Sequence, residues 1–195
     1  MSVYNAIKYN NSYANAGGLV LLSTSTASSS ASVSLTSGLT STYKEYIFLF
    51  NNIHPATDGA NLQFQVSTNA GSSYGVNITS TYFQAQHAQS DSESALEYDA
   101  GQDLAQSTNF QTILAKEPGN GNDKSVSGYM HLYEPSNTTF VKHFLARGNC
   151  QDPEPMSRDG FTEGYVNSTS AVNAIQFKMS SGNMDSGVIQ MFGVV

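Results

Sequence analysis

Short runs in which apolar and polar residues alternate recur along nearly the whole chain, separated by turns rich in Gly, Asn, Asp and Pro. A period of two places successive side chains on opposite faces of a strand. About nine such strand candidates occur, without repeated units or heptads, at the spacing typical of a β-sandwich. The sequence therefore predicts an all-β fold: a single antiparallel β-sandwich of jelly-roll type spanning residues 19–195, preceded by an irregular N-terminal arm, residues 1–18.

The N-terminal half contains five of these strand candidates. An apolar run at 19–22 and an alternating run at 31–35 flank a serine tract, which predicts two short strands joined by a hairpin or bend, with a linker as the alternative. The most apolar run, 45–50, predicts a central strand covered on both faces. Alternation at 62–66 and again at 74–78, around an Asn-Ala-Gly turn, predicts a hairpin with one wet face.

The C-terminal half is less regular. Residues 90–122 open with a possible capping box at Ser90 and Glu93, so at most one short helix is predicted there, with an irregular loop as the equal alternative. A short strand is expected near 110–114. Two further strands are expected at 126–133 and 140–145, followed by a long loop over 149–164.

The chain closes on a predicted hairpin in which Ile175, Phe177 and Met179 pair with the strand around Val188 to Phe192 or their neighbours. Ending a chain on apolar residues is unusual because termini generally fray. We expect the sandwich to bury Val188, Phe192 and Val194, each contributing roughly 1.5–3 kcal/mol.

Composition excludes several classes of function. Charged residues make up 12% of the chain, against about 25% in typical domains. Polarity comes instead from 28 Ser, 15 Thr, 17 Asn and 11 Gln. The net charge is −7 and the 8 basic residues are scattered, so no nucleic-acid partner is expected. We expect no membrane partner, because no run approaches the length of a span, and the N-terminus resembles no signal peptide.

The chain lacks the familiar catalytic motifs, and we predict no catalytic residue, cofactor or metal. His131 and His143 lie on neighbouring strand candidates, but local hydrogen bonding is favoured over a metal site. Acidic residues gather in two predicted loops: Asp91, Glu93, Glu97, Asp99 and Asp103, and Asp152, Glu154, Asp159 and Glu163. A solvated surface is favoured there over a glycosidase pair or a calcium site. Cys150 is expected to be an unreactive thiol.

Two segments resemble virion proteins of tailed bacteriophages. One is the closing stretch AVNAIQFKMSSGNMDSGVIQMFGV, with its Ser-Gly-Asn turn and aromatic-Gly ending. The other runs from GLVLLSTSTASSS through YKEYIFLFNNIHP to the Gly-Ser-Ser-Tyr turn. Together they cover about half of the chain and are structural motifs, so the resemblance implies a virion β-sandwich rather than an activity. Residues 85–125 carry no part of it.

The resemblance implies a non-enzymatic structural protein located in the virion and assembled in the cytoplasm of the bacterial host. A capsid decoration or cement protein is favoured, since the chain has a compact domain and a short arm but no fibre shaft. Its partners would be the major capsid protein or other virion proteins, and a homo-oligomer, with a trimer favoured, is expected. Tyr4, Ile7, Tyr9 and Tyr13 of the arm would make the intersubunit contacts, unless the arm is disordered.

Three other functions stay open. One is a tail-fibre or tail-tip module that binds host glycans through tyrosines and carboxylates. Another is a glycan hydrolase. The last is a cellular lectin-like or spore-coat β-sandwich protein that does not belong to a virion.

Overall fold

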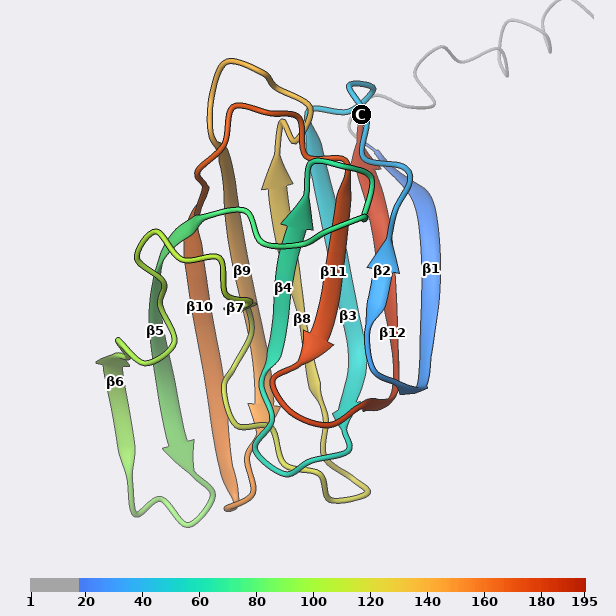
Figure 1. Ribbon diagram of the computed structural model, residues 1–195. Helices are drawn as coiled ribbons and strands as arrows, with labels where there is room; N and C mark the ends of the chain where they lie inside the picture. Colours follow the sequence, from blue (N-terminus) through green and yellow to red (C-terminus); the bar gives the residue numbers. More distant parts are fainter. Residues whose placement is uncertain (1–17) are drawn as a thin grey trace, which may run out of the picture.

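The computed structural model describes residues 18–195, and this part of the chain contains twelve β-strands and no helix (Figure 1). The strands are β1 (Leu19–Ser30), β2 (Val33–Leu35), β3 (Glu45–Pro55), β4 (Leu62–Ser67), β5 (Ile78–Ala88), β6 (Ser94–Tyr98), β7 (Gln111–Thr112), β8 (Val126–Tyr133), β9 (Lys142–Gln151), β10 (Met156–Val166), β11 (Ala174–Met179) and β12 (Met184–Val194). No helix long and apolar enough to cross a membrane occurs between residues 18 and 195.

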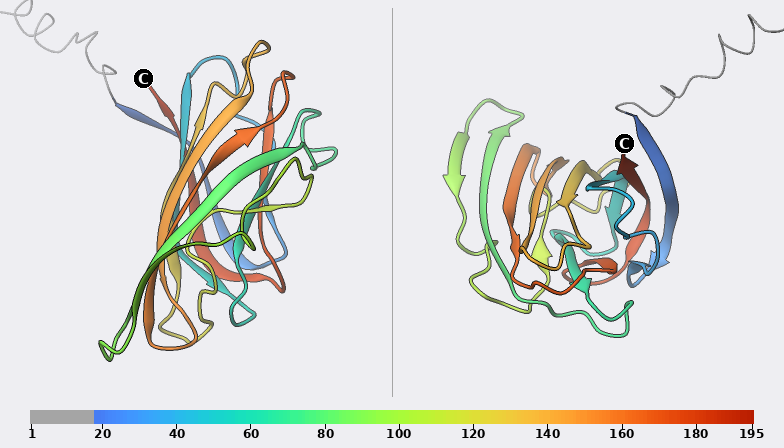
Figure 2. Two further views of the ribbon diagram at one scale, coloured as in Figure 1. Left: turned by 90° about the vertical axis from the view of Figure 1, so that its left-hand side faces the viewer. Right: turned by 90° about the horizontal axis from the view of Figure 1, so that it is seen from above.

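The strands form two antiparallel sheets that pack face to face. The large sheet has the order β1-β12-β3-β8-β9-β10-β5-β6, and the small sheet has the order β2-β11-β4-β7. Figure 2 shows the large sheet curving around the small one, with β5 and β6 extending past it on one side and β1 on the other. The predicted all-β antiparallel sandwich is confirmed.

Eight of the strands connect as a rolled-up hairpin: β1, β2, β3, β4, β7, β8, β11 and β12. The first of these pairs with the eighth, the second with the seventh, the third with the sixth and the fourth with the fifth. This pairing is the connectivity of a jelly roll. The other four strands form the β5–β6 and β9–β10 hairpins, which lengthen the large sheet beyond β8. We call these four strands the extension.

The core lies between the two sheets and is dominated by aromatic side chains. Phe177 of β11 packs edge-to-face on Phe48 and Phe50 of β3, with ring centroids 5.4 and 5.1 Å apart. Each such pair contributes about 0.5–1.5 kcal/mol beyond area burial. Tyr46 is buried beside them, so one face of β3 is fully covered. The opposite face is only half-buried, and the expectation that both faces of this strand are covered was wrong.

All three predicted hairpins were wrong because their strands belong to different sheets. The serine tract is the end of β1 rather than a turn, and β1 pairs with β12 whereas β2 pairs with β11. Strand β4 pairs with β11 and β7, whereas β5 pairs with β10 and β6. Closing strands β11 and β12 likewise lie in opposite sheets. Adjacency in sequence suggested hairpins, but the jelly roll moves the chain from one sheet to the other at these turns.

The face of β12 that enters the core also differs from the expectation. Ile189 and Met191 are buried between the sheets, whereas Val188, Phe192 and Val194 lie on the opposite face and are only half-buried. Both faces of this strand are apolar in sequence, so the alternation alone did not identify the inner one.

The segments expected to form a long loop and a short helix are strands in part. Strands β9 and β10 are separated only by residues 152–155, so most of the predicted loop over 149–164 is strand β10. Its inward positions include Gly160, Thr162 and Gly164 instead of large apolar residues, which concealed the strand. No helix forms between 90 and 122, where β6 and β7 are joined by irregular chain.

Candidate functional site

The candidate site lies on the outer face of the large sheet, which points away from the small sheet. Strand register aligns outward side chains of β3, β8, β9, β10 and β5 in adjacent rows. We call this set the outer band: Ile47, Leu49, Phe83, Tyr129, His131, Tyr133, His143, Leu145, Arg147, Phe161 and Tyr165. Outward positions of an antiparallel sheet are usually polar, so a set this rich in aromatic and aliphatic side chains, interrupted by Glu163 and Thr81, is a candidate binding surface.

One end of the outer band is a stack across β5, β10 and β9. The rings of Phe83 and Phe161 are parallel, with centroids 4.6 Å apart. The Arg147 guanidinium lies 4.5 Å from the centre of the Phe161 ring and donates to Asp159 through Nη2 at 2.6 Å. This hydrogen bond holds the pKa of Arg147 above its usual value. The stack therefore presents an aromatic surface beside an Arg147–Asp159 ion pair.

The middle of the band runs along β8. The His131 ring packs edge-on to Tyr129 at 5.3 Å and stacks with Tyr133 at 6.1 Å. Its Nδ1 contacts the Glu45 carboxylate of β3, which orients the ring. Burial and the nearby Glu45 charge raise the pKa of Tyr133, so its hydroxyl stays protonated and can donate.

Two depressions flank Leu145. One has a volume of about 330 Å³ and is lined by side chains that include Thr81, His143, Glu163 and Tyr165. The other, of about 300 Å³, is lined by Tyr129, His131, Tyr133, Arg147, Phe161 and Glu163. Glu163 lines both, and its carboxylate forms no ion pair or hydrogen bond with another side chain among residues 18–195. Tyr129 is 39% and Leu145 41% exposed, so the ridge between the depressions is accessible.

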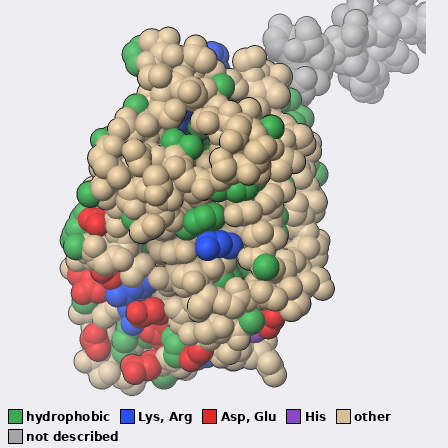
Figure 3. Space-filling view, viewed as in Figure 1, with side chains coloured by type: hydrophobic (Ala, Val, Ile, Leu, Met, Phe, Trp, Pro, Cys, Tyr) green, Lys and Arg blue, Asp and Glu red, His purple; other side chains and the backbone are tan. Residues whose placement is uncertain are grey.

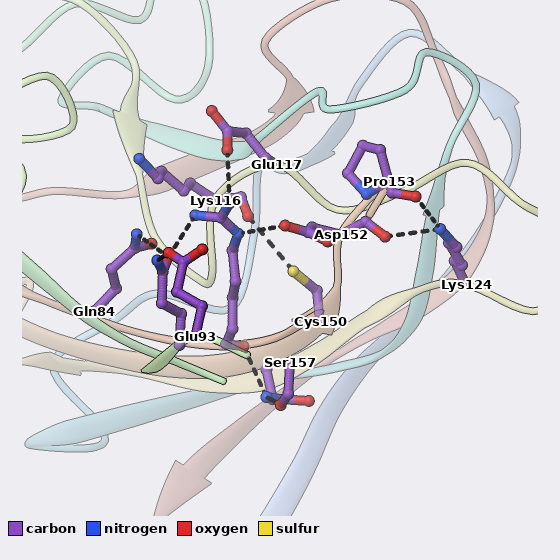
Figure 4. A network of polar contacts seen from close by, with 12 residues as sticks. Gln84, Glu93, Lys116, Glu117, Lys124, Cys150, Asp152, Pro153 and Ser157 are labelled. Carbon is purple, nitrogen blue, oxygen red and sulfur yellow. Dashed lines mark hydrogen bonds and ion pairs between the residues drawn. The ribbon is translucent and has the colours of Figure 1, made fainter. Parts of the chain in front are cut away.

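A second polar cluster lies on the inner side of the extension, where the segment over 99–121, which includes the short edge strand β7, covers the strands. Figure 4 shows Asp152, Glu117, Lys116 and Cys150 gathered there. Arg158 of β10 donates from Nε to Asp152 at 2.7 Å and contacts Glu117 at 3.4 Å. Lys116 bonds Asp99 at 2.6 Å and lowers the pKa of that carboxyl. These acidic groups neutralise buried cations, which is a structural role.

Cys150 belongs to this inner cluster. Its thiol is buried, and burial, aided by the Asp152 charge, raises its pKa to about 12. The thiolate is the reactive form, so the geometry agrees with the expected unreactive thiol.

The two acidic groups found in the sequence converge on the extension but divide between its faces. Figure 3 shows red side chains gathered over one lower corner of the molecule, while most of that face carries no charge. Asp99 and Asp152 enter the inner cluster, whereas Asp159 and Glu163 lie on the outer face of β10. The second group was expected in a loop; instead its last two members are carried by a strand.

His131 and His143 do lie on adjacent strands, but the register places His131 opposite Leu145. The two imidazoles have separate partners, Glu45 for His131 and the Tyr165 ring for His143. Among the residues described, no three His, Cys, Asp or Glu side chains are grouped closely enough to hold a metal ion. The interface residues predicted in the arm, Tyr4, Ile7, Tyr9 and Tyr13, lie outside the described part of the chain.

Sequence reasoning missed the outer band as a unit. The alternation in β8 already separated Tyr129, His131 and Tyr133 from the buried face. The missing signal was β10, because treating its sequence as a loop removed Phe161 and Tyr165 from the sheet. Comparisons with protein-family models, with curated proteins and with solved structures found no match to this chain.

Proposed function

We propose that this protein is a non-enzymatic structural protein of a bacteriophage virion, a capsid decoration protein that docks on the shell through the outer band. The observation that supports docking is the band itself, an accessible aromatic and aliphatic surface across five strands of the large sheet. Tyr, Phe and Arg are enriched in the centres of protein interfaces, and Lys and Glu are depleted. The virion assignment rests on the sequence resemblance.

The proposed partner is the major capsid protein or another virion protein. The charges of the band suit a protein surface of mixed polarity, since Arg147 is already paired with Asp159 and His131 with Glu45. Glu163 supplies an unpaired carboxylate between the two depressions. A cationic side chain at the centre of the partner's surface would complement it.

The number of copies per virus particle tests whether the protein decorates the capsid or lies at a tail or vertex. Quantitative mass spectrometry of purified particles of the encoding phage should find hundreds of copies, in proportion to the capsid lattice. A few to a few dozen copies would place the protein at a tail or vertex and overturn the decoration assignment.

The docking surface is tested with the full-length protein and shells that lack it. The double substitution Tyr129→Ser and Leu145→Ser removes the exposed ridge of the band and should weaken shell binding by at least about tenfold. Leu96→Ser is the matched control, because Leu96 is 74% exposed but lies on β6 outside the band. Equal binding by the double variant and the wild type would show that the band is not the docking surface.

A second candidate is host-glycan binding by a tail module. The observation that favours it is the pairing of aromatic rings with polar groups around the two depressions, notably Tyr165 beside His143 and Glu163. Small-ligand sites combine an apolar wall with a few polar groups that set orientation. Binding of the purified protein to a glycan array, abolished by Tyr165→Ala, would support this function, whereas no binding to glycans or host cells would exclude it.

A further inference from the structure

The four sheet edges of the sandwich differ in length and charge. The small sheet ends in β2 and β7, which have three and two residues. The large sheet ends at β6, which has five residues including Glu97 and is flanked by Glu93 and Asp99. Short strands and charges are the usual means by which proteins prevent edges from pairing with other chains. Three of the four edges are thus protected.

The fourth edge, β1, lacks these protections. It is twelve residues long, LVLLSTSTASSS, and contains no charged residue and no proline. A bulge interrupts its pairing with β12 between Leu21 and Ser23, but the register from Ser23 to Ser28 is regular. Within residues 18–195, only β12 pairs with this strand, so the backbone N–H and C=O groups on its other side pair with no strand, although the Ser28 N–H donates to the Ser30 hydroxyl.

We propose that β1 pairs antiparallel with β1 of a second copy of this chain, joining two large sheets into one continuous sheet. A second copy is the favoured partner because a two-fold axis makes an antiparallel strand complementary to itself. It also brings together two uncharged edges, whereas pairing two β6 edges would bring carboxylates together. The inference is independent of the docking function proposed above, and it replaces the trimer expected from the sequence resemblance with a two-fold dimer.

The pleat of β1 restricts the register of this pairing. Thr24 and Thr26 are exposed on the outer face, opposite Gln190 and Val188 of β12, whereas Ala27 is buried. Residues paired across two adjacent strands point to the same face of the sheet, so an outer residue of one copy must pair with an outer residue of the other. This requires the two-fold axis to lie at a residue that pairs with its own copy, rather than between two residues. An axis at Ser25 places Thr24 of each copy opposite Thr26 of the other. Cross-strand Thr pairs stabilise antiparallel sheets.

The test compares the mass of the full-length protein and of edge variants in solution. Analytical ultracentrifugation of the wild type should find twice the 20.9 kDa of one chain. Thr24→Lys combined with Thr26→Lys places four ammonium groups at the junction and should raise the dimer dissociation constant by about 100-fold or more. Ser94→Lys combined with Leu96→Lys is the matched control, since it adds two charges to the outer face of the opposite edge and should leave the dimer intact.

Hydrogen exchange provides a second measurement. Alternate amides between Ser23 and Ser28, those not bonded to β12, should exchange at least about tenfold more slowly in the wild type than in the lysine variant. The variant should keep cooperative unfolding, which shows that it is folded.

Three results would overturn the proposal: a monomeric wild type, a dimer that survives both lysines, or a trimer, which a two-fold contact cannot close. If the wild type is a monomer, slow exchange of those amides would mean that residues 1–17 of the same chain cover the edge.

Discussion

Arg158 and Asp152 form an ion pair beneath the extension, with 2.7 Å between Arg158 Nε and Asp152 Oδ2. The Asp152 side chain is 3% exposed and that of Arg158 13%. The pair ties the short β9–β10 turn to β10, and the backbone carbonyl of Asp152 accepts a further bond from Lys124. These contacts fix the β9–β10 turn at the corner of the molecule where the acidic side chains gather (Figure 3).

Removing one partner of this pair should be costly. Asp152→Ala leaves the Arg158 guanidinium in its buried position with only Glu117, at 3.4 Å, as a carboxylate partner. We expect the free energy of unfolding, measured with urea, to fall by about 3–5 kcal/mol. Asp91→Asn is the control: within residues 18–195 the Asp91 side chain, which is 91% exposed, pairs only with His87, and Asn tolerates the positive φ of 60° at this position, so loss of the charge should cost less than about 1 kcal/mol. Equal effects of the two substitutions would contradict the prediction.

The buried thiol of Cys150 should make stability depend on alkaline pH. Its pKa is about 12 in the folded protein, against a reference value of 9.0. The protonated thiol therefore contributes stability that is fully present below pH 9 and is lost as pH rises toward 12. At pH 10.5 the ionised thiol should stabilise the unfolded chain by about 2 kcal/mol.

Urea unfolding at pH 8 and pH 10.5 tests this dependence. Cys150→Ala should lose less stability between the two values than the wild type does, because it has no thiol to ionise. Parallel losses in the two proteins would show that Cys150 does not contribute to the dependence. In the folded protein at pH 8, the thiol should react with a disulfide reagent only as fast as the protein unfolds.

Two adjacent residues of β12 test which face of the strand enters the core. Ile189 is fully buried and its substitution by Ala should lower the free energy of unfolding by about 2–5 kcal/mol. Val188 lies on the outer face and is half-buried, so Val188→Ala should cost about 1 kcal/mol or less. The reverse order in denaturant titrations would place the wrong face of β12 in the core.

Deletion of residues 188–195 should unfold the domain. Strand β12 lies between β1 and β3 and pairs with both, so its loss detaches β1 and removes Ile189 and Met191 from the core. The truncated protein should show neither cooperative thermal melting nor dispersed NMR signals. A soluble truncation that melts cooperatively would refute this expectation.

Gly160 should tolerate no side chain. A Cβ atom there would lie 2.7 Å from the Ala115 Cα, the Leu114 carbonyl oxygen and the Tyr82 hydroxyl. Two of these contacts are backbone atoms of the loop that covers β10, so Gly160→Ala should cost about 3 kcal/mol in thermal or urea unfolding. Gly18→Ala, where nothing lies within 4 Å of the added atom, is the control and should be nearly neutral. An unchanged stability for Gly160→Ala would mean that this loop packs differently.

Strands such as β8 were predicted correctly because buried apolar residues and outward-facing residues alternate along them without interruption. In β8, Val126, Met130 and Leu132 are buried and the intervening aromatic residues face outward, as their period of two indicates. Strand β10 was missed because its inner positions are occupied by small residues where the covering loop approaches closely. A period of two appears in sequence only where the two faces differ in hydrophobicity, and in β10 they do not.

The candidate site could be found from sequence only in part. Tyr129, His131 and Tyr133 were separated from the core by alternation within a single strand. Their joining with Leu145, Phe161 and Tyr165 depends on which strands are neighbours and in what register. The inward-facing Lys142 shows the same limit, because its burial depends on the Phe140 and Ser168 carbonyls that accept hydrogen bonds from its ammonium group. Burial also lowers the pKa of this lysine.

The sequence by itself determined the fold class, the central position of β3 and the apolar character of the final strand, because these follow from local alternation and turn residues. The tertiary structure alone decided which sheet each strand joins, which face of β12 is buried and that β5, β6, β9 and β10 extend the large sheet. Strand pairing joins residues far apart in the chain, such as Leu19 with Val194. Such pairings are selected by the packing of the whole core, which no single segment encodes.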